Sequence, residues 1–149
     1  MDSLHQLLVP VDGSQTSVKA LEAAIELARL NRARLRLLYV IDALDYANGF
    51  ETARTYYEET LPLMHTDGER LLAQMRSLAE AKGVVCDSVL LEAGAERLCD
   101  VVAEHARQVH ADMIVLGSHG RRGLNRVLMG SDAEQIVRRA PVPVLVIKA

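Results

Sequence analysis

Five short apolar runs are the feature of this 149-residue sequence that most restricts its fold. They cover residues 7–11, 35–41, 84–91, 113–116 and 142–147. Most of them are apolar at nearly every position, whereas a strand with one side in water alternates apolar and polar residues. Continuous runs of this length are typical of strands that are covered on both faces of a parallel sheet.

The segments between these runs have the three- and four-residue apolar spacing of amphipathic helices. In the first of them, Val18, Leu21, Ile25 and Ala28 fall on one face. The predicted helices cover residues 14–31, 56–82, 98–109 and 133–140. Alternating strands and helices with right-handed crossovers indicate helices on both faces of a parallel sheet. We predict an α/β fold in which residues 1–149 form a single doubly wound domain, with a five-stranded parallel sheet of order 3-2-1-4-5.

Two stretches fit this pattern less well. Residues 43–55 have weak periodicity, and we expect a loop there. Pro62 lies inside the predicted helix 56–82, where a missing N–H and a bulky ring disfavour helix. The helix therefore either begins near Leu61 or kinks at the proline.

The last apolar run also predicts assembly. Pro143 lies within it, and proline is expected on an edge strand or at the start of a strand. An apolar strand at an open edge favours aggregation unless another chain pairs with it. We therefore predict a homodimer joined through residues 142–148.

Bulk composition narrows the functional classes. The net charge is −3, aromatic residues make up 3% of the chain and tryptophan is absent, which argues against a nucleic-acid partner. No apolar stretch approaches the roughly 20 residues of a membrane span, and no signal peptide is visible. Cys86 and Cys99 form no CxxC pair, so buried reduced thiols are expected. These features predict a cytoplasmic protein.

A glycine-rich stretch follows the fourth run. The run stops at Gly117, and glycines and arginines lead to Gly130 and Ser131, ahead of the last predicted helix. Glycine lets backbone N–H groups approach a ligand, and a helix start attracts anions. Ser131 either caps the helix or donates to a phosphate oxygen. The alternative is that the glycines only form a turn, since the spacing is neither a P-loop nor GxGxxG.

The predicted strand order places Asp12, after the first strand, beside this glycine-rich stretch. At this point four blocks resemble the universal stress protein family over the whole chain. The blocks are residues 8–14, 39–42, 112–120 and 141–146. The most specific part is Gly-x2-Gly-x9-Gly-Ser, formed here by Gly117, Gly120, Gly130 and Ser131.

The resemblance implies the ATP-binding subclass of that family, often with a divalent metal such as Mg²⁺ and with dimerisation through the last strand. It places adenosine near the ends of the first two strands and the phosphates at the start of the last helix. The residues that it assigns to the nucleotide site are Pro10, Val11, Asp12, Val40, Leu116, Gly117, His119, Gly120, Arg121, Gly130, Ser131, Asp132 and Ala133.

Asp132 departs from the family pattern, in which the residue after the serine is small or apolar. Two unit charges about 4–5 Å apart repel by about 3–4 kcal/mol at an effective dielectric constant of ~20. Arg121, Arg122 and Arg126 are available to offset this repulsion. Asp132 is otherwise suited to stabilise the helix start or to help hold Mg²⁺, and we favour the helix-start role.

The function that these features predict is a nucleotide-dependent switch or partner-binding dimer in the stress response, with an unidentified partner protein. The alternatives are an interaction module of the same fold without nucleotide, and a weak ATPase. No catalytic residue is predicted. His119 is the one titratable group in the stretch suited to act as a base, and contact with the ribose or a phosphate is the favoured role for it.

Overall fold

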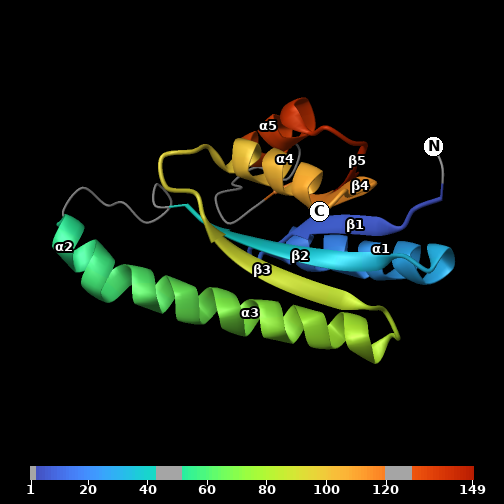
Figure 1. The fold of residues 1–149 in the computed structure, drawn as a ribbon, viewed down its shortest axis with the longest axis horizontal. Coiled ribbons are helices and arrows are strands. Elements are labelled where there is room, and N and C mark those ends of the chain that lie inside the picture. Colours follow the sequence, from blue (N-terminus) through green and yellow to red (C-terminus); the bar gives the residue numbers. More distant parts are fainter. Residues whose placement is uncertain (1–2, 43–51, 120–128) are drawn as a thin grey trace.

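The protein contains a five-stranded parallel sheet covered by helices, as seen in a computed structural model that describes residues 3–42, 52–119 and 129–149 (Figure 1). The strands are β1 (Gln6–Pro10), β2 (Arg34–Ile41), β3 (Cys86–Glu92), β4 (Met113–Gly117) and β5 (Val144–Ile147). They lie in the order β3-β2-β1-β4-β5, and every neighbouring pair is parallel. The predicted fold class and strand order are confirmed.

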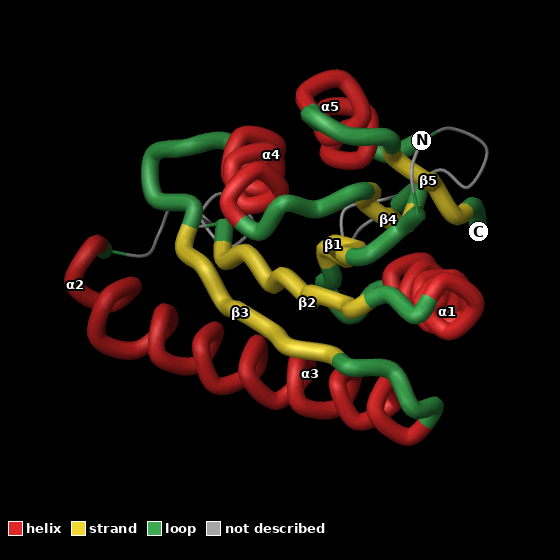
Figure 2. The backbone as a smooth tube through the Cα atoms, turned by 45° about the vertical axis from the view of Figure 1, so that its right-hand side comes forward, coloured by secondary structure: helices red, strands yellow, loops and turns green. Residues whose placement is uncertain are grey.

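Two pairs of helices cover the sheet, one pair on each face (Figure 2). The helical elements are α1 (Gln15–Asn31), α2 (Ala53–Thr55), the π-helical turn η2 (Tyr56–Thr60), α3 (Leu61–Ala81), α4 (Leu98–Gln108) and α5 (Ser131–Arg139). Helices α1 and α3 pack on one face, and α4 and α5 pack on the other. Among the described helices, none has the length and apolar character needed to cross a bilayer.

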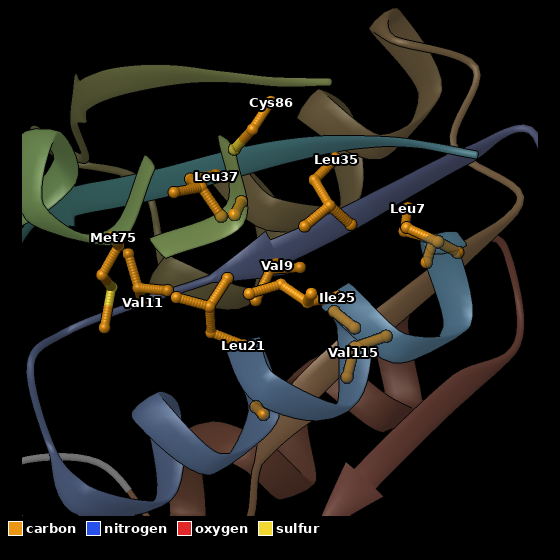
Figure 3. Close-up of a cluster of buried hydrophobic side chains, with 14 of the residues drawn as sticks. Leu7, Val9, Val11, Leu21, Ile25, Leu35, Leu37, Met75, Cys86 and Val115 are labelled. Carbon is orange, nitrogen blue, oxygen red and sulfur yellow. The ribbon is translucent and has the colours of Figure 1, made fainter. Parts of the chain in front are cut away.

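Alternation along the central strand explains why both faces need an apolar cover. Leu7 and Val9 enter the cluster beneath α1 and α3, whereas Leu8 enters the cluster beneath α4 and α5, and all three are fully buried. Figure 3 shows Val9 beside Leu21 and Ile25 of α1. Burying each such side chain contributes roughly 1.5–3 kcal/mol. The sheet therefore has one apolar core on each of its faces.

The predicted loop at residues 43–55 is wrong in part. Residues 53–55 form α2 and run on into η2, while 43–51 lie outside the described residues. Neither α2 nor η2 buries a residue, so this helical stretch leaves no apolar periodicity in the sequence.

Pro62 is accommodated at the start of α3. The wider turn before it closes with a bond from the N–H of Leu61 to the carbonyl of Tyr56, and Pro62 occupies the first turn of the α-helix that follows. An N–H at that position has no partner within the helix, so its absence costs little. The helix begins at Leu61, as the first of the two alternatives stated.

Several element ends differ slightly from the predicted ones. Strand β3 begins at Cys86 and β5 begins at Val144, so Pro143 precedes its strand and supplies only a carbonyl, which accepts from the N–H of Ile114 at 3.0 Å. Both cysteines are buried and free, as expected, and burial raises the pKa of Cys86 to about 12.

Candidate functional site

A pocket lies at the carboxyl ends of β1 and β4, where two neighbouring strands lead into connections on opposite sides of the sheet. Open parallel sheets bind ligands at such points. Its described lining is Pro10, Val11, Asp12, Ser17, Leu38, Val40, Leu98, Leu116, Gly117, His119, Asp132, Ala133 and Ile136. Residues from the two ends of the sequence therefore share one pocket, as the predicted strand order required for Asp12 and the glycine-rich stretch.

Most of the predicted nucleotide residues meet in this pocket. Those that line it are Pro10, Val11, Asp12, Val40, Leu116, Gly117, His119, Asp132 and Ala133. Gly130 and Ser131 lie beside it, at the start of α5. Gly120 and Arg121, with Arg122 and Arg126, fall outside the described residues.

Sequence reasoning missed four lining residues, which are Ser17, Leu38, Leu98 and Ile136. Leu98 and Ile136 belong to apolar helical stripes and were assigned to the core. Leu38 lies on a strand beside the pocket and Ser17 lies within a helix, so neither has a local signal. The predicted strand order was the one signal that could have identified them, because it brings these elements to one edge of the sheet.

The described lining of the pocket combines aliphatic and polar side chains. Leu38, Val40 and Leu98 supply aliphatic surface, which suits a flat apolar group such as a base. Asp12, His119 and Asp132 are the titratable groups in the described lining, and that part of the lining contains no lysine or arginine.

Asp12 shapes the turn between β1 and α1 as well as lining the pocket. One carboxylate oxygen accepts from the N–H of Ser14 at 2.8 Å, and the N–H of Asp12 donates to the hydroxyl of Ser17 at 3.4 Å. An aspartate that bonds the backbone two residues on is typical of such turns. Asp12 is thereby fixed in the wall of the pocket before any ligand binds.

The start of α1 also holds the main chain of His119. The hydroxyls of Thr16 and Ser14 both donate to the His119 carbonyl, Ser14 at 3.3 Å, and the N–H of His119 lies 3.4 Å from the Thr16 hydroxyl. These contacts join residues more than 100 positions apart in the sequence. They tie the end of β4 to the first turn of α1.

Gly117 is required by this close approach. A Cβ added at Gly117 would lie 2.7 Å from the carbonyl carbon of Thr16 and 2.9 Å from the N–H nitrogen of Ser17. The helix start therefore packs where a side chain would otherwise lie. The glycine serves packing between α1 and β4 as well as the pocket that it lines.

The start of α5 is arranged differently. Gly130 is its N-cap, with extended backbone and no side-chain cap hydrogen bond, and Ser131 is the first helical residue. The interpretation of Ser131 as the cap is therefore wrong, because the carbonyl of Gly130 already accepts the first helical bond, from Glu134 at 2.9 Å. Main-chain N–H groups in the first turn of a helix are suited to bind an anion.

Asp132 lies in the first turn of α5 and also lines the pocket. A carboxylate at this position interacts favourably with the helix dipole, and the helix-start role of Asp132 stays a prediction. Because it also faces the pocket, its charge bears on any anion that binds at the helix start.

The profile of the universal stress protein family matches residues 4–148. The chain belongs to the universal stress protein family. A universal stress protein of Methanocaldococcus jannaschii is 32% identical over 143 residues, which are 96% of this chain and 81% of the relative.

Solved universal stress proteins share the fold. The structure from Burkholderia pseudomallei is 32% identical with a TM-score of 0.78, over 100% of this chain and 99% of that one. The protein UspA from Lactobacillus plantarum is 26% identical with a TM-score of 0.84, over 99% and 100%.

Two further structures of the family contain nucleotides. One is a complex with cAMP, at 21% identity and a TM-score of 0.69 over 99% of this chain and 98% of that one. The other, from Archaeoglobus fulgidus, is a complex with dAMP, at 22% identity and a TM-score of 0.66 over 99% and 100%. At these identities the likeness concerns the fold.

The acidic side chains that line the pocket of this universal stress protein are the candidate ligands for Mg²⁺. The described residues contain no group of three or more histidine, cysteine or acidic side chains placed to hold a metal. Two carboxylates, from Asp12 and Asp132, do line the pocket. Mg²⁺ commonly binds through one or two carboxylates together with substrate phosphates. The donor set fits Mg²⁺ carried in by a nucleotide, with Asp12 or Asp132 as the protein ligand.

Proposed function

We propose that this universal stress protein binds an adenine nucleotide in the pocket at the ends of β1 and β4, and acts as a nucleotide-dependent regulator in the stress response. The observation that carries the proposal is the combination of an aliphatic wall, a glycine at the end of β4 and a helix start without a side-chain cap in one pocket. The aliphatic wall suits the base and the helix start suits the phosphate, while the glycine lets the ligand approach the main chain between them.

The adenine lies against the aliphatic wall formed by Leu38, Val40 and Leu98. The ribose lies between Asp12 and His119, the two polar residues nearest the strand ends. The first phosphate lies at the start of α5, where main-chain N–H groups of the first turn bind anions without any lysine or arginine.

ATP with Mg²⁺ is the ligand that we propose, on the basis of the Gly-x2-Gly-x9-Gly-Ser spacing that ends at Ser131. The complexes of two universal stress proteins with cAMP and dAMP support an adenine nucleotide as the ligand class. In such a complex Mg²⁺ would offset the negative charge of the phosphates, and the carboxylate of Asp12 or Asp132 would hold it.

The regulatory form that we propose is a homodimer joined through residues 142–148. Strand β5 lies at an edge of the sheet, carries no charged residue and leaves Leu145 37% exposed. An edge strand of this composition is stabilised by pairing with a second copy. Ligand binding in each protomer then changes a surface that a partner protein reads.

The nucleotide proposal is tested by melting the nucleotide-stripped protein with adenosine, AMP, ADP or ATP, with and without Mg²⁺. A ligand at about 100 times its dissociation constant adds about 2.7 kcal/mol, which is several degrees for a domain of this size. Leu98→Glu places a carboxylate in the aliphatic wall and should abolish the shift. The matched control is Leu78→Glu, at an exposed leucine of α3, which should keep it.

Absence of a shift with all four ligands in the wild-type protein would contradict nucleotide binding and favour an interaction module of the same fold.

The dimer is tested separately by light scattering. Leu145→Lys should yield monomers, whereas Val85→Lys, at an exposed valine beside the opposite edge strand, should leave the dimer intact. A monomeric wild-type protein would contradict the assembly while leaving the nucleotide proposal standing.

A further inference from the structure

The ring of His119 has one nitrogen with a partner and one without. Its Nδ1 lies 2.9 Å from the hydroxyl of Ser118, a residue that is only 3% exposed. Its Nε2 is buried and has no hydrogen-bond partner among the residues that the structure describes. Buried polar atoms nearly always have partners, and His119 lines the pocket, so a bound ligand is the natural source of the missing one.

The hydroxyl of Ser118 determines which nitrogen carries the hydrogen. Within the described part of the chain, the His119 ring is the partner recorded for this hydroxyl. A buried hydroxyl hydrogen needs an acceptor, and Nδ1 accepts only when it carries no hydrogen itself. A neutral ring then carries its hydrogen on Nε2, where it acts as a donor. The opposite tautomer would leave the Ser118 hydrogen buried and unpaired.

The neighbouring main chain fixes the ring in place. The N–H of Ser118 donates to the carbonyl of Ile147 at 2.8 Å, and its carbonyl accepts from the N–H of Gly130 at 2.7 Å. The carbonyl of His119 is held by the hydroxyls of Ser14 and Thr16. The donor is therefore oriented by the fold before a ligand arrives, which lowers the entropy lost on binding.

We infer that Ser118 is a positioning residue that presents His119 to the nucleotide as an Nε2–H donor, and that the pocket thereby selects ligands with an oxygen acceptor at that point. This inference rests on the proposed nucleotide function. The acceptor is an oxygen of the ribose or of the first phosphate, and adenosine and AMP distinguish the two sources.

The tautomer is measured without any ligand. Long-range ¹⁵N–¹H NMR spectra of the unliganded wild-type protein, recorded at alkaline pH where a histidine is neutral, should show His119 with its hydrogen on Nε2. A hydrogen on Nδ1 would overturn the role given to Ser118. A purely structural serine would not fix the tautomer of a neighbouring ring.

The ligand contact is measured by titrating AMP and adenosine into four proteins. These are the wild type, Ser118→Ala, His119→Gln and the double variant. Losing one neutral hydrogen bond should weaken AMP binding by roughly three- to tenfold in Ser118→Ala. The glutamine amide nitrogen can take the place of Nε2 without help from Ser118, so adding Ser118→Ala to His119→Gln should change the affinity little. His119→Asn, whose amide lies nearer the position of Nδ1, should bind more weakly than His119→Gln.

An equal loss from Ser118→Ala in both backgrounds would overturn the inference, because Ser118 would then act independently of His119. A loss for AMP and adenosine alike assigns the acceptor to the ribose, and a loss for AMP alone assigns it to the phosphate. Failure of the wild-type protein to bind either ligand overturns the proposed function together with the ligand contact. Binding by a protein with the Nδ1–H tautomer overturns only the positioning role.

Discussion

Two helices start at the pocket, and their first turns are built in opposite ways. The first turn of α1 is closed by side chains, since Ser14 caps it by accepting from the N–H of Ser17 and also donates to the His119 carbonyl. The first turn of α5 follows Gly130, which supplies no side-chain cap. The two helices follow neighbouring strands, so the difference is not one of position in the sheet.

The contrast separates a structural helix start from one that can receive a ligand. Capping by hydroxyls consumes the hydrogen bonds that an anion would otherwise make. In α1 those bonds hold the fold together across the pocket, whereas Gly130 has no side chain that could make the corresponding bonds at the start of α5. Substitutions at the two starts should therefore affect different quantities, stability for α1 and affinity for α5.

The largest expected effect follows from filling the space at Gly117. Gly117→Ala places a Cβ 2.7 Å from the main chain of Thr16, and backbone shifts of this kind typically cost about 1–3 kcal/mol. Urea unfolding should show this loss. The matched variant is Gly130→Ala at the α5 start, where the nearest atom to the new Cβ lies 3.2 Å away, and it should cost clearly less. Equal losses of stability in the two variants would contradict the tighter packing at the start of α1.

The next effect concerns the charge at the α5 start. Asp132→Asn removes a carboxylate from the pocket wall, so free ATP should bind about tenfold more tightly, a change of about 1.4 kcal/mol that is well below the full repulsion of a close charge pair. Calorimetric titration without Mg²⁺ measures it. Glu134→Gln is the control, because Glu134 lies in the same turn, pairs with Arg138 at 2.8 Å and does not line the pocket. A similar gain in the control would assign the effect to the helix dipole.

A smaller effect is expected from removing the cap of α1. Ser14→Ala should lower stability by about 1 kcal/mol, since it deletes both the cap and the bond to His119. Ser131→Ala, at the exposed first residue of α5, should leave the melting temperature nearly unchanged. Comparable losses in the two variants would remove the distinction between the closed and the open helix start.

The smallest expected effect is a dependence of stability on pH, which arises at His105, away from the two helix starts. Burial, and then the nearby Arg36, lower the pKa of His105, whose Nε2 lies 3.3 Å from the Arg36 Nε, while Asp87 pairs with Arg36 at 3.0 Å. Protonation therefore favours the unfolded chain, in which the pKa is near 6.5. The free energy of unfolding should fall as the pH drops through 6.5 towards the lower pKa of the folded state.

Thermal melts of His105→Gln across this range should show a flatter dependence on pH. His5→Gln, at an exposed residue, serves as the control and should keep the slope of the wild type. An unchanged slope in His105→Gln would place the responsible group elsewhere.

The fold was predictable because its signal is local. The run at 113–116 is apolar along its whole length, and the spacing of Leu21 and Ile25 identifies a helix without reference to the rest of the chain. The short helix α2 was missed because it buries no residue, so no apolar period exists at residues 53–55.

The candidate site was predictable only in part. Glycine spacing and strand order brought Asp12 and Gly117 to one pocket, but the bonds from Ser14 and Thr16 to His119 were not foreseen. A hydroxyl at a helix start is already explained by capping, and its second partner lies more than 100 residues away in the sequence. Contacts of that kind depend on the finished packing and leave no pattern at short spacing.

Ser118 has a consequence for how information passes through the molecule. Its N–H bonds to Ile147 in β5 and its carbonyl bonds to Gly130 at the start of α5, so the main chain of one residue connects the edge strand to the helix start beside the pocket. If a ligand displaces this residue, ligand binding and formation of the proposed dimer are coupled. Thermodynamic reciprocity then requires dimer formation to change the affinity for the ligand by the same factor by which the ligand changes the affinity between protomers. The dissociation constant of the proposed dimer, measured with and without nucleotide, would therefore be a second measure of the same coupling free energy.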